Sequence, residues 1–201
     1  MVHLLDTPAA GRYSVVYADP PWHFRTYGRA RNAKGAEAHY ATQALDTIGQ
    51  LPVARVAADA AWLFMWSTAP HLEQAFELAR RWSDPNNPWT FRTFGAWAKR
   101  PRGWRGDPAR WQMGTGHIFR SAAEPLLVFG RGYPSWTGRG ERNLWIAPIR
   151  AHSQKPDEVS DMIRRTTVGP RLEMFARAPC EGFDPWGFDA WDRQLIAKKE
   201  R

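Results

Sequence analysis

The chain has 201 residues, of which 43% are hydrophobic and 24% charged, a composition typical of one soluble domain with a sizeable core. Its formal net charge of +8 favours a polyanionic partner such as nucleic acid, although composition fits a merely basic protein equally well. A single cysteine excludes an intrachain disulfide and a cysteine-rich zinc site, and we expect no metal. It also fits a reducing cytoplasm, and no apolar run reaches the roughly 20 residues of a membrane span.

The first predicted element is a buried strand over residues 15–18, and Asp19-Pro20-Pro21-Trp22 follows it directly. Adjacent prolines fix φ and lack an N–H donor, so neither a helix nor a strand ladder continues through them. The turn leaves the Asp19 carboxylate and the Pro20 carbonyl as acceptors at the carboxyl end of a strand, where open α/β sheets bind ligands. A rigid turn without chemistry is the alternative interpretation.

Two acceptors beside an aromatic ring suit an aromatic amine such as the exocyclic amino group of adenine. Its nitrogen is a poor nucleophile because its lone pair is delocalised into the ring. Hydrogen bonds from its N–H groups to Asp19 and Pro20 would favour pyramidalisation and aim the lone pair at an electrophile such as a sulfonium methyl. Trp22 could stack on the base. The pattern therefore predicts methyl transfer to an amine.

Residues 23–39 are polar and rich in arginine, and we interpret them as a substrate lid whose cations meet phosphates; a surface loop is the alternative. Residues 46–58 predict a helix-rich connection, and residues 62–66 predict a second buried strand. The sequence Ser-Thr-Ala-Pro at 67–70 offers a capping hydroxyl to the amphipathic helix predicted over 72–82. Strand and helix together make a βα unit, which favours a parallel sheet.

A further strand is predicted over residues 90–98, followed by a basic loop over 100–116 in which Trp104 and Trp111 alternate with arginines. Arginine suits phosphates and tryptophan suits bases, so this loop predicts contact with nucleic acid. A solvated loop pinned by tryptophan explains the pattern equally well. Residues 124–130 predict another strand, followed by a hairpin-like basic loop.

Lys155 precedes a second amphipathic helix, which begins after Pro156 with acids in its first turn. A lysine there can hold an anion together with the free N–H groups of the helix start, or it can be an ordinary capping-region residue. Residues 172–176 predict a last strand with Glu173 and Arg177 at polar positions, as ligand contacts or as an edge ion pair. No Gly-x-Gly-x-x-Gly sequence follows a strand, so the usual dinucleotide fingerprint is absent.

Together these segments resemble the Asp-Pro-Pro-Trp amino-methyltransferase family, typified by the catalytic subunit of the messenger-RNA adenosine-N6 methyltransferase and including small bacterial and phage relatives. The likeness extends over most of the chain and keeps the family's order of motifs. Besides residues 19–22, the segments that carry it are 35–42, 63–66, 97–99, 114–120, 152–158 and 172–177.

The resemblance implies a Rossmann-like α/β fold over residues 1–201 as one domain, with a mostly parallel sheet flanked by helices and a circularly permuted motif order. It implies S-adenosyl-L-methionine as cofactor and residues 19–22 as the catalytic motif. The cofactor-binding candidates are Asp6, Asp19, Lys155, Glu173, Arg177 and Asp189. The substrate-binding candidates are Tyr40, which would sandwich the base with Trp22, and Trp97, Lys99, His117, Arg120, Arg25 and Arg29.

Two candidates have plainer interpretations, Asp6 as a solvated acid and His117 as a structural histidine. The chain also departs from the family near its C-terminus. Phe188 stands where the family has an asparagine that bonds the cofactor ribose, and Asp189 is a candidate substitute. This departure weakens the cofactor assignment there but leaves Lys155 unaffected.

We expect adenine-N6 methylation of DNA, with the target base flipped out of a duplex. RNA is the first alternative, and the lack of an appended zinc finger or partner-binding extension favours DNA. A non-catalytic nucleic-acid-binding partner of an active homologue is disfavoured by the intact motif at Asp19, and cytosine-C5 methylation would need Cys180 as nucleophile. We expect a monomer or homodimer without membrane association, in the cytoplasm of a prokaryotic or phage-infected cell.

Overall fold

The computed structural model describes residues 8–22, 45–101, 103–107, 111–112, 114, 118–150, 154–176 and 179–186. The strands are β1 (Tyr13–Ala18), β2 (Ala57–Trp66), β3 (Thr90–Arg100), β4 (Ala123–Arg131), β5 (Leu144–Pro148), β6 (Arg171–Met174) and β7 (Asp184–Trp186). The helices are α1 (Leu45–Gly49), α2 (Val53–Val56), α3 (Leu72–Arg81) and α4 (Asp157–Thr166), with a 3₁₀ turn (Ala69–His71) before α3. Among the described residues, no helix has the length and apolarity needed to cross a bilayer.

The described strands form one seven-stranded sheet in the order β5-β3-β4-β2-β1-β6-β7. Strand β1 runs parallel to β2 and β6, β6 runs parallel to β7, and β3 runs parallel to β5, whereas β4 is antiparallel to both β2 and β3. Every described strand except β4 therefore points the same way, and the predicted mostly parallel sheet is confirmed. The carboxyl ends of β1, β2, β3 and β6 and the beginning of β4 consequently share one edge.

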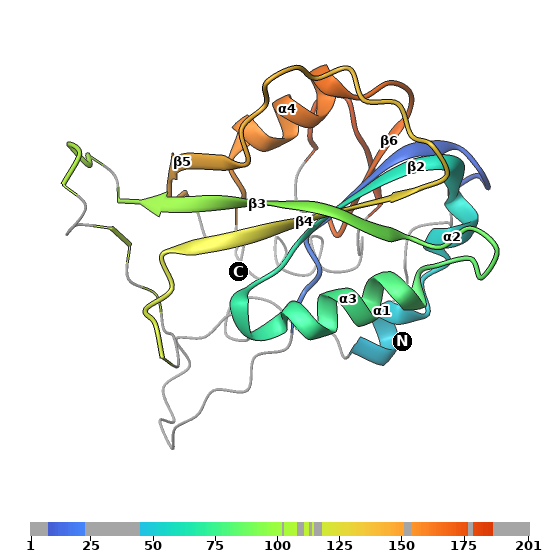
Figure 1. The fold of residues 1–201 in the computed structure, drawn as a ribbon, viewed down its shortest axis with the longest axis horizontal. Helices are drawn as coiled ribbons and strands as arrows, with labels where there is room; N and C mark the ends of the chain where they lie inside the picture. The colour runs from blue at the N-terminus through green and yellow to red at the C-terminus, as the bar shows by residue number, and fades with distance from the viewer. Residues whose placement is uncertain are drawn as a thin grey trace, which may run out of the picture.

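Helices cover both faces of this sheet, with α1 and α3 on one face and α4 on the other (Figure 1). The apolar stripe of α3 buries Leu78 among the side chains of β1 and β2, and α4 buries Val159 and Ile163 on the opposite face. These stripes recur at helical spacing, which is why the sequence predicts both helices. The layers fix the sheet and leave its carboxyl edge for ligands.

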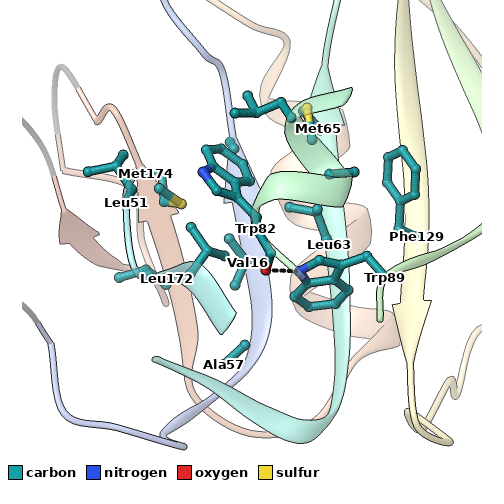
Figure 2. Close-up of a cluster of buried hydrophobic side chains, with 14 of the residues drawn as sticks. Val16, Leu51, Ala57, Leu63, Met65, Trp82, Trp89, Phe129, Leu172 and Met174 are labelled. Carbon is teal, nitrogen blue, oxygen red and sulfur yellow. Dashed lines mark hydrogen bonds between the residues drawn. The ribbon is translucent and has the colours of Figure 1, made fainter. Parts of the chain in front are cut away.

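Several tryptophans belong to this framework. Trp82 is buried between α1 and β1, and its Nε1 donates to the Ile48 carbonyl at 2.8 Å. Trp89 donates from Nε1 to the Trp82 carbonyl at 3.0 Å, the bond drawn in Figure 2 among the side chains of this core. Each indole thus buries a large ring while its N–H is satisfied, which makes these tryptophans structural.

Three local expectations are wrong. The segment after β4 does not return as a hairpin, because β5 pairs in parallel with β3 on the far side of that strand. Strand β6 is not the last, since β7 adds beyond it at the sheet's edge. The Thr68 hydroxyl does not cap α3; it shares a hydrogen bond with Nδ1 of His71 at 2.8 Å instead. The two strand pairings are set by tertiary contacts, whereas the third difference is a local bond between residues three positions apart.

Candidate active site

The carboxyl edge of the sheet gathers charged side chains that are far apart in the sequence. Asp19 follows β1, Lys99 lies near the end of β3, Glu124 lies at the beginning of β4, and Glu173 lies on β6. Lys155 reaches the same place from the segment that precedes α4. Order along the chain therefore does not separate the predicted catalytic residue from the predicted cofactor residues. We call these five side chains the edge cluster.

The centre of the edge cluster is an ion pair between Asp19 and Lys155. The Lys155 Nζ donates to Oδ2 of Asp19 at 2.8 Å across 136 positions of sequence. The two side chains are 23% and 13% exposed respectively, so the pair is largely shielded from water. The Lys155 ammonium also lies 5.7 Å from the centroid of the Trp66 ring, a favourable cation–π distance. The predicted catalytic acid and the predicted cofactor lysine thus contact each other directly.

Glu124 extends this ion pair into a network. Its carboxylate lies 3.4 Å from Nζ of Lys155 and also forms an ion pair with Lys99. Burial favours a raised pKa for Glu124, but the charges of Lys155 and Lys99 outweigh burial and lower the pKa. Glu124 is therefore a buried carboxylate that holds two lysines in place.

Glu173 is the uncompensated member of the edge cluster. It lies opposite Tyr17 in the register of β1 and β6, and its buried Oε2 has no hydrogen-bond partner in the described part of the chain. Burial, together with the nearby negative charge of Asp19, raises the pKa of Glu173 to about 7. A buried acceptor without a partner costs free energy until a donor arrives. Glu173 is therefore suited to accept a hydroxyl or ammonium donor of a ligand.

Glu173 predicts a distinct pH dependence of stability. Its folded-state pKa of about 7 exceeds the ordinary 4.5, so its ionisation penalises the folded state as pH rises through that range. The unfolding free energy of Glu173→Gln minus that of wild type should therefore increase between about pH 5 and pH 8. The increase should be on the order of 2 kcal/mol after allowance for partial exposure. Urea unfolding at both pH values measures this. Glu158→Gln, at an exposed position of α4, is the control, and a Glu173→Gln profile parallel to wild type would contradict the assignment.

The two prolines of the motif make a buried, tight turn. The Trp22 backbone N–H donates to the Pro20 carbonyl at 2.8 Å, closing a three-residue turn. A carbonyl oxygen carries two lone pairs, so this bond leaves one acceptor site on Pro20. Pro20 and Pro21 are both buried. The turn is thus rigid, and Asp19 is the more exposed of the two predicted acceptors.

The structure contradicts the base-stacking role predicted for Trp22. Its side chain is 6% exposed and packs in the core on the α3 face of the sheet. The indole Nε1 donates to the Trp66 carbonyl at 3.2 Å, and the ring stacks on His71 with centroids 5.7 Å apart. Trp22 therefore fastens the Pro-Pro turn to β2 instead of offering a ring face to a base.

A second correction concerns Trp97, predicted to bind substrate. It is 3% exposed, and its Nε1 donates to the Ala147 carbonyl on β5 at 3.0 Å. Its ring lies under the ammonium of Lys99 at 4.9 Å, so Trp97 positions that lysine rather than touching substrate. Lys99 itself lies in the edge cluster. Arg120 is exposed in the segment leading into β4, where a phosphate can reach it.

The other predicted site residues lie outside the described residues. These are Asp6, Arg25, Arg29, Tyr40, His117, Arg177 and Asp189, together with Phe188. Their roles remain predictions from the resemblance.

Glu124 is the site residue that sequence reasoning missed. It stands at the start of a predicted apolar strand, which is a signal in itself because an acid is unusual there. The acid at this position can be assigned to the site once the direction of β4 is known. Since β4 runs against its neighbours, its beginning rather than its end lies beside Asp19 and Lys155.

A cavity of about 290 Å³ lies on the α4 face, away from the edge cluster. Its lining is mostly apolar and includes Trp62, Trp136 and Trp145. Its acid, Glu141, is already paired with Arg165 at 2.7 Å. The acid of this cavity is therefore already engaged, and Asp19 and Lys155 lie at the sheet edge instead, so we place the reaction at the edge.

Comparison with known proteins gives a consistent family. The profile of the MT-A70 family matches residues 13–189. The chain is 29% identical over 203 residues to the Type II methyltransferase M.MunI of a Mycoplasma species, covering 92% of this chain and 80% of that protein. It is 30% identical over 181 residues to the human N(6)-adenosine-methyltransferase catalytic subunit METTL3, covering 88% of this chain.

A Drosophila melanogaster N(6)-adenosine-methyltransferase MT-A70-like protein is likewise 30% identical over 181 residues. The chain spans 27% of the length of METTL3 and 26% of the Drosophila protein, so it corresponds to one part of those longer proteins. Residues 13–189, which the family profile matches, contain the whole edge cluster. By the match over residues 13–189, the chain belongs to the MT-A70 family of methyltransferases.

Proposed function

We propose that this protein is an S-adenosyl-L-methionine-dependent methyltransferase that modifies the N6 amine of adenine in DNA. The observation that carries the proposal is the Asp19 carboxylate at the tip of β1, beside the buried Pro-Pro turn and paired with Lys155. A carboxylate and a carbonyl from adjacent residues suit an amine with two N–H donors. Family membership supplies methyl transfer as the reaction type.

The edge cluster fits the cofactor in charge and in donor chemistry. S-adenosylmethionine carries a carboxylate, an ammonium group, ribose hydroxyls and a sulfonium. Lys155 would hold the carboxylate, and the unpartnered Oε2 of Glu173 would accept from a hydroxyl or from the ammonium. Glu173, whose pKa is about 7, would ionise as a cationic ligand binds, and the cluster would then carry three acids against Lys99 and Lys155 and complement a cationic cofactor. Bound there, the cofactor supplies an activated methyl group.

Asp19 and Pro20 then act on the substrate amine. Each accepts one N–H, which fixes the nitrogen and turns its lone pair away from the ring system. On taking the methyl group from sulfur, the nitrogen would gain positive charge, which the Asp19 carboxylate would stabilise without having to move, and the surplus N–H proton would then leave to solvent. Trp22, by fastening the turn to β2, keeps the two acceptors in register.

The substrate side of the edge is basic. Lys99 and Arg120 lie at the end of β3 and before β4, and the loop that joins these strands carries further arginines. With the net charge of +8, this surface suits the phosphates of nucleic acid. A cytoplasmic location and a monomeric or homodimeric state remain predictions.

DNA is the favoured substrate because the chain matches M.MunI, a type II methyltransferase, over most of both proteins. RNA is the second candidate, because METTL3 and its relatives are named as adenosine methyltransferases. Cytosine-C5 methylation is disfavoured: burial raises the pKa of the Cys180 thiol, which opposes formation of the nucleophilic thiolate.

Mass spectrometry of nucleosides after incubation with cofactor and matched DNA or RNA tests this function. We expect N6-methyladenine in DNA, formed faster than in RNA of the same sequence. A clear preference for RNA would replace DNA by the second candidate. Methylated cytosine, or no methylated adenine in either polymer, would refute the proposed function.

Lys155 can be tested by binding alone. Lys155→Met should weaken S-adenosylhomocysteine about 10- to 100-fold, because a charge-assisted hydrogen bond to the ligand carboxylate is lost. Titration calorimetry measures this without catalysis. Arg165→Met, which removes an exposed cation of α4 away from the edge cluster, should change the affinity by no more than about threefold. If Lys155→Met binds S-adenosylhomocysteine as tightly as wild type, Lys155 is not part of the cofactor site.

A further inference from the structure

Two adjacent apolar side chains stand almost fully in solvent beside the proposed active site. Ile118 is 86% exposed and Phe119 is 85% exposed. Among the exposed large hydrophobic side chains of the described residues, only Tyr133 is more exposed, at 98%. Contiguous apolar surface of this kind marks a place of contact with a partner.

Their position ties these side chains to the edge cluster. They lie in the segment that leads from the end of β3 into β4, and the Gly114 N–H donates to the Ser121 carbonyl at 2.8 Å behind them. The Lys99 N–H donates to the Ala122 carbonyl, also at 2.8 Å. Phe119 is five residues from Glu124, a reach of at most about 17 Å for extended chain. Tyr133, by contrast, follows β4 at the opposite edge of the sheet.

The charge around Ile118 and Phe119 indicates a polyanion as the partner. Arg120 comes directly after Phe119 and is exposed. Arg100, the last residue of β3, adds a cation at the same edge of the sheet. A base step of a DNA duplex offers what this combination requires, namely apolar base faces flanked by phosphates. Proteins that unstack DNA insert side chains such as Phe and Ile in this way.

The proposed reaction would open a gap of this kind in the duplex. Asp19 lies within the sheet edge at 23% exposure, so a base in a duplex reaches it only after rotating out of the stack. Rotation leaves a gap and costs a few kcal/mol of stacking and pairing. An apolar ring that enters the gap recovers part of that stacking.

We propose that Phe119, with Ile118 beside it, enters the duplex where the target adenine has left, and that Arg120 contacts a flanking phosphate. This inference rests on the proposed DNA adenine methylation. Phe119 is then a positioning residue that stabilises the extrahelical base and takes no part in methyl transfer.

The test compares Phe119→Ala with wild type on three DNA substrates that share one target adenine. On a fully paired duplex, kcat/KM should fall at least about 10-fold. On a duplex whose target faces an abasic site, and on the single strand, the variant should stay within about twofold of wild type, because extrusion costs little there. With 2-aminopurine at the target and S-adenosylhomocysteine bound, Phe119→Ala should give a weaker rise in fluorescence than wild type.

Tyr133→Ala is the matched control, since it removes an equally exposed aromatic ring far from the edge cluster, and it should behave as wild type on all three substrates. Phe119→Leu should restore most of the activity on paired duplex. Arg120→Gln should weaken duplex binding uniformly and reduce the slope of log affinity against log salt by about one.

The outcomes separate this inference from the proposed function. If wild type methylates DNA but Phe119→Ala loses equally on all three substrates, or if the variant changes the oligomeric state, Phe119 serves another contact and the inference is wrong. Wild-type activity restricted to single strands would also overturn it, leaving the methyltransferase assignment intact. Absence of DNA adenine methylation by wild type would remove the proposed function itself.

Discussion

Asp19→Asn should reduce methyl transfer by about 100- to 1,000-fold or more in kcat while leaving the fold intact. The amide replaces a charged acceptor by a neutral one and adds a donor facing the amine. It therefore loses both the orientation of the nucleophile and the stabilisation of its developing positive charge. Initial rates with labelled cofactor measure the loss, and thermal unfolding measures the fold.

The network explains why the fold should tolerate this change. Lys155 loses its strongest partner in Asp19→Asn but stays 3.4 Å from the Glu124 carboxylate, so its charge is not stranded. Asp161→Asn, which removes an exposed partner of Arg164 on α4, is the matched control and should retain wild-type turnover. Normal turnover by Asp19→Asn would eliminate the acceptor mechanism.

Trp22→Ala should cost about 3–5 kcal/mol of unfolding free energy, the usual range for removing a large buried aromatic ring. The deletion leaves a cavity against β2 and removes the stacking on His71. Trp22→Phe keeps most of the ring and loses the bond to the Trp66 carbonyl, so it should cost about 1 kcal/mol. Urea unfolding of the three proteins gives these values.

The same two variants distinguish the observed role of Trp22 from the predicted one. If the ring holds the turn, Trp22→Phe should keep most of the wild-type kcat and KM. If the ring instead stacks on the target base, Trp22→Ala would raise KM sharply with little change in stability. The second result would restore the interpretation that the buried position of Trp22 contradicts.

Local patterns were sufficient for most of the elements. Strand β1 and the predicted part of β2, residues 62–66, are short apolar runs that stop at prolines or polar residues, and α3 and α4 carry apolar residues at helical spacing. These patterns involve residues that are close together in the sequence, so they can be recognised without knowledge of the fold. The parallel character of the sheet followed from the alternation of such strands and helices.

The contacts within the edge cluster depend on the order and direction of the strands, so local sequence patterns could not predict them. The resemblance assigned Asp19 and Lys155 to one site, but their direct ion pair requires the sheet order. Glu124 becomes a partner of Lys155 because β4 is inserted in reverse between β2 and β3. Nothing within a few residues of Glu124 encodes that direction.

The burial of Trp22 and Trp97 was missed for a related reason. The residue type alone does not show whether a tryptophan beside a catalytic motif stacks on a base or packs in the core. The Pro-Pro turn sends Trp22 to the α3 face of the sheet, and the pleat of β3 sends Trp97 to the α4 face. The choice of face is settled by partners on other strands, such as the Trp66 and Ala147 carbonyls.

A crystal structure of the protein with S-adenosylhomocysteine tests the central claim most directly. We expect the ligand's sulfur beside the Asp19 carboxylate at the tip of β1, with the ligand's own carboxylate on Lys155. A ligand seated away from this edge, or an Asp19 side chain turned into the protein interior in that complex, would contradict the account.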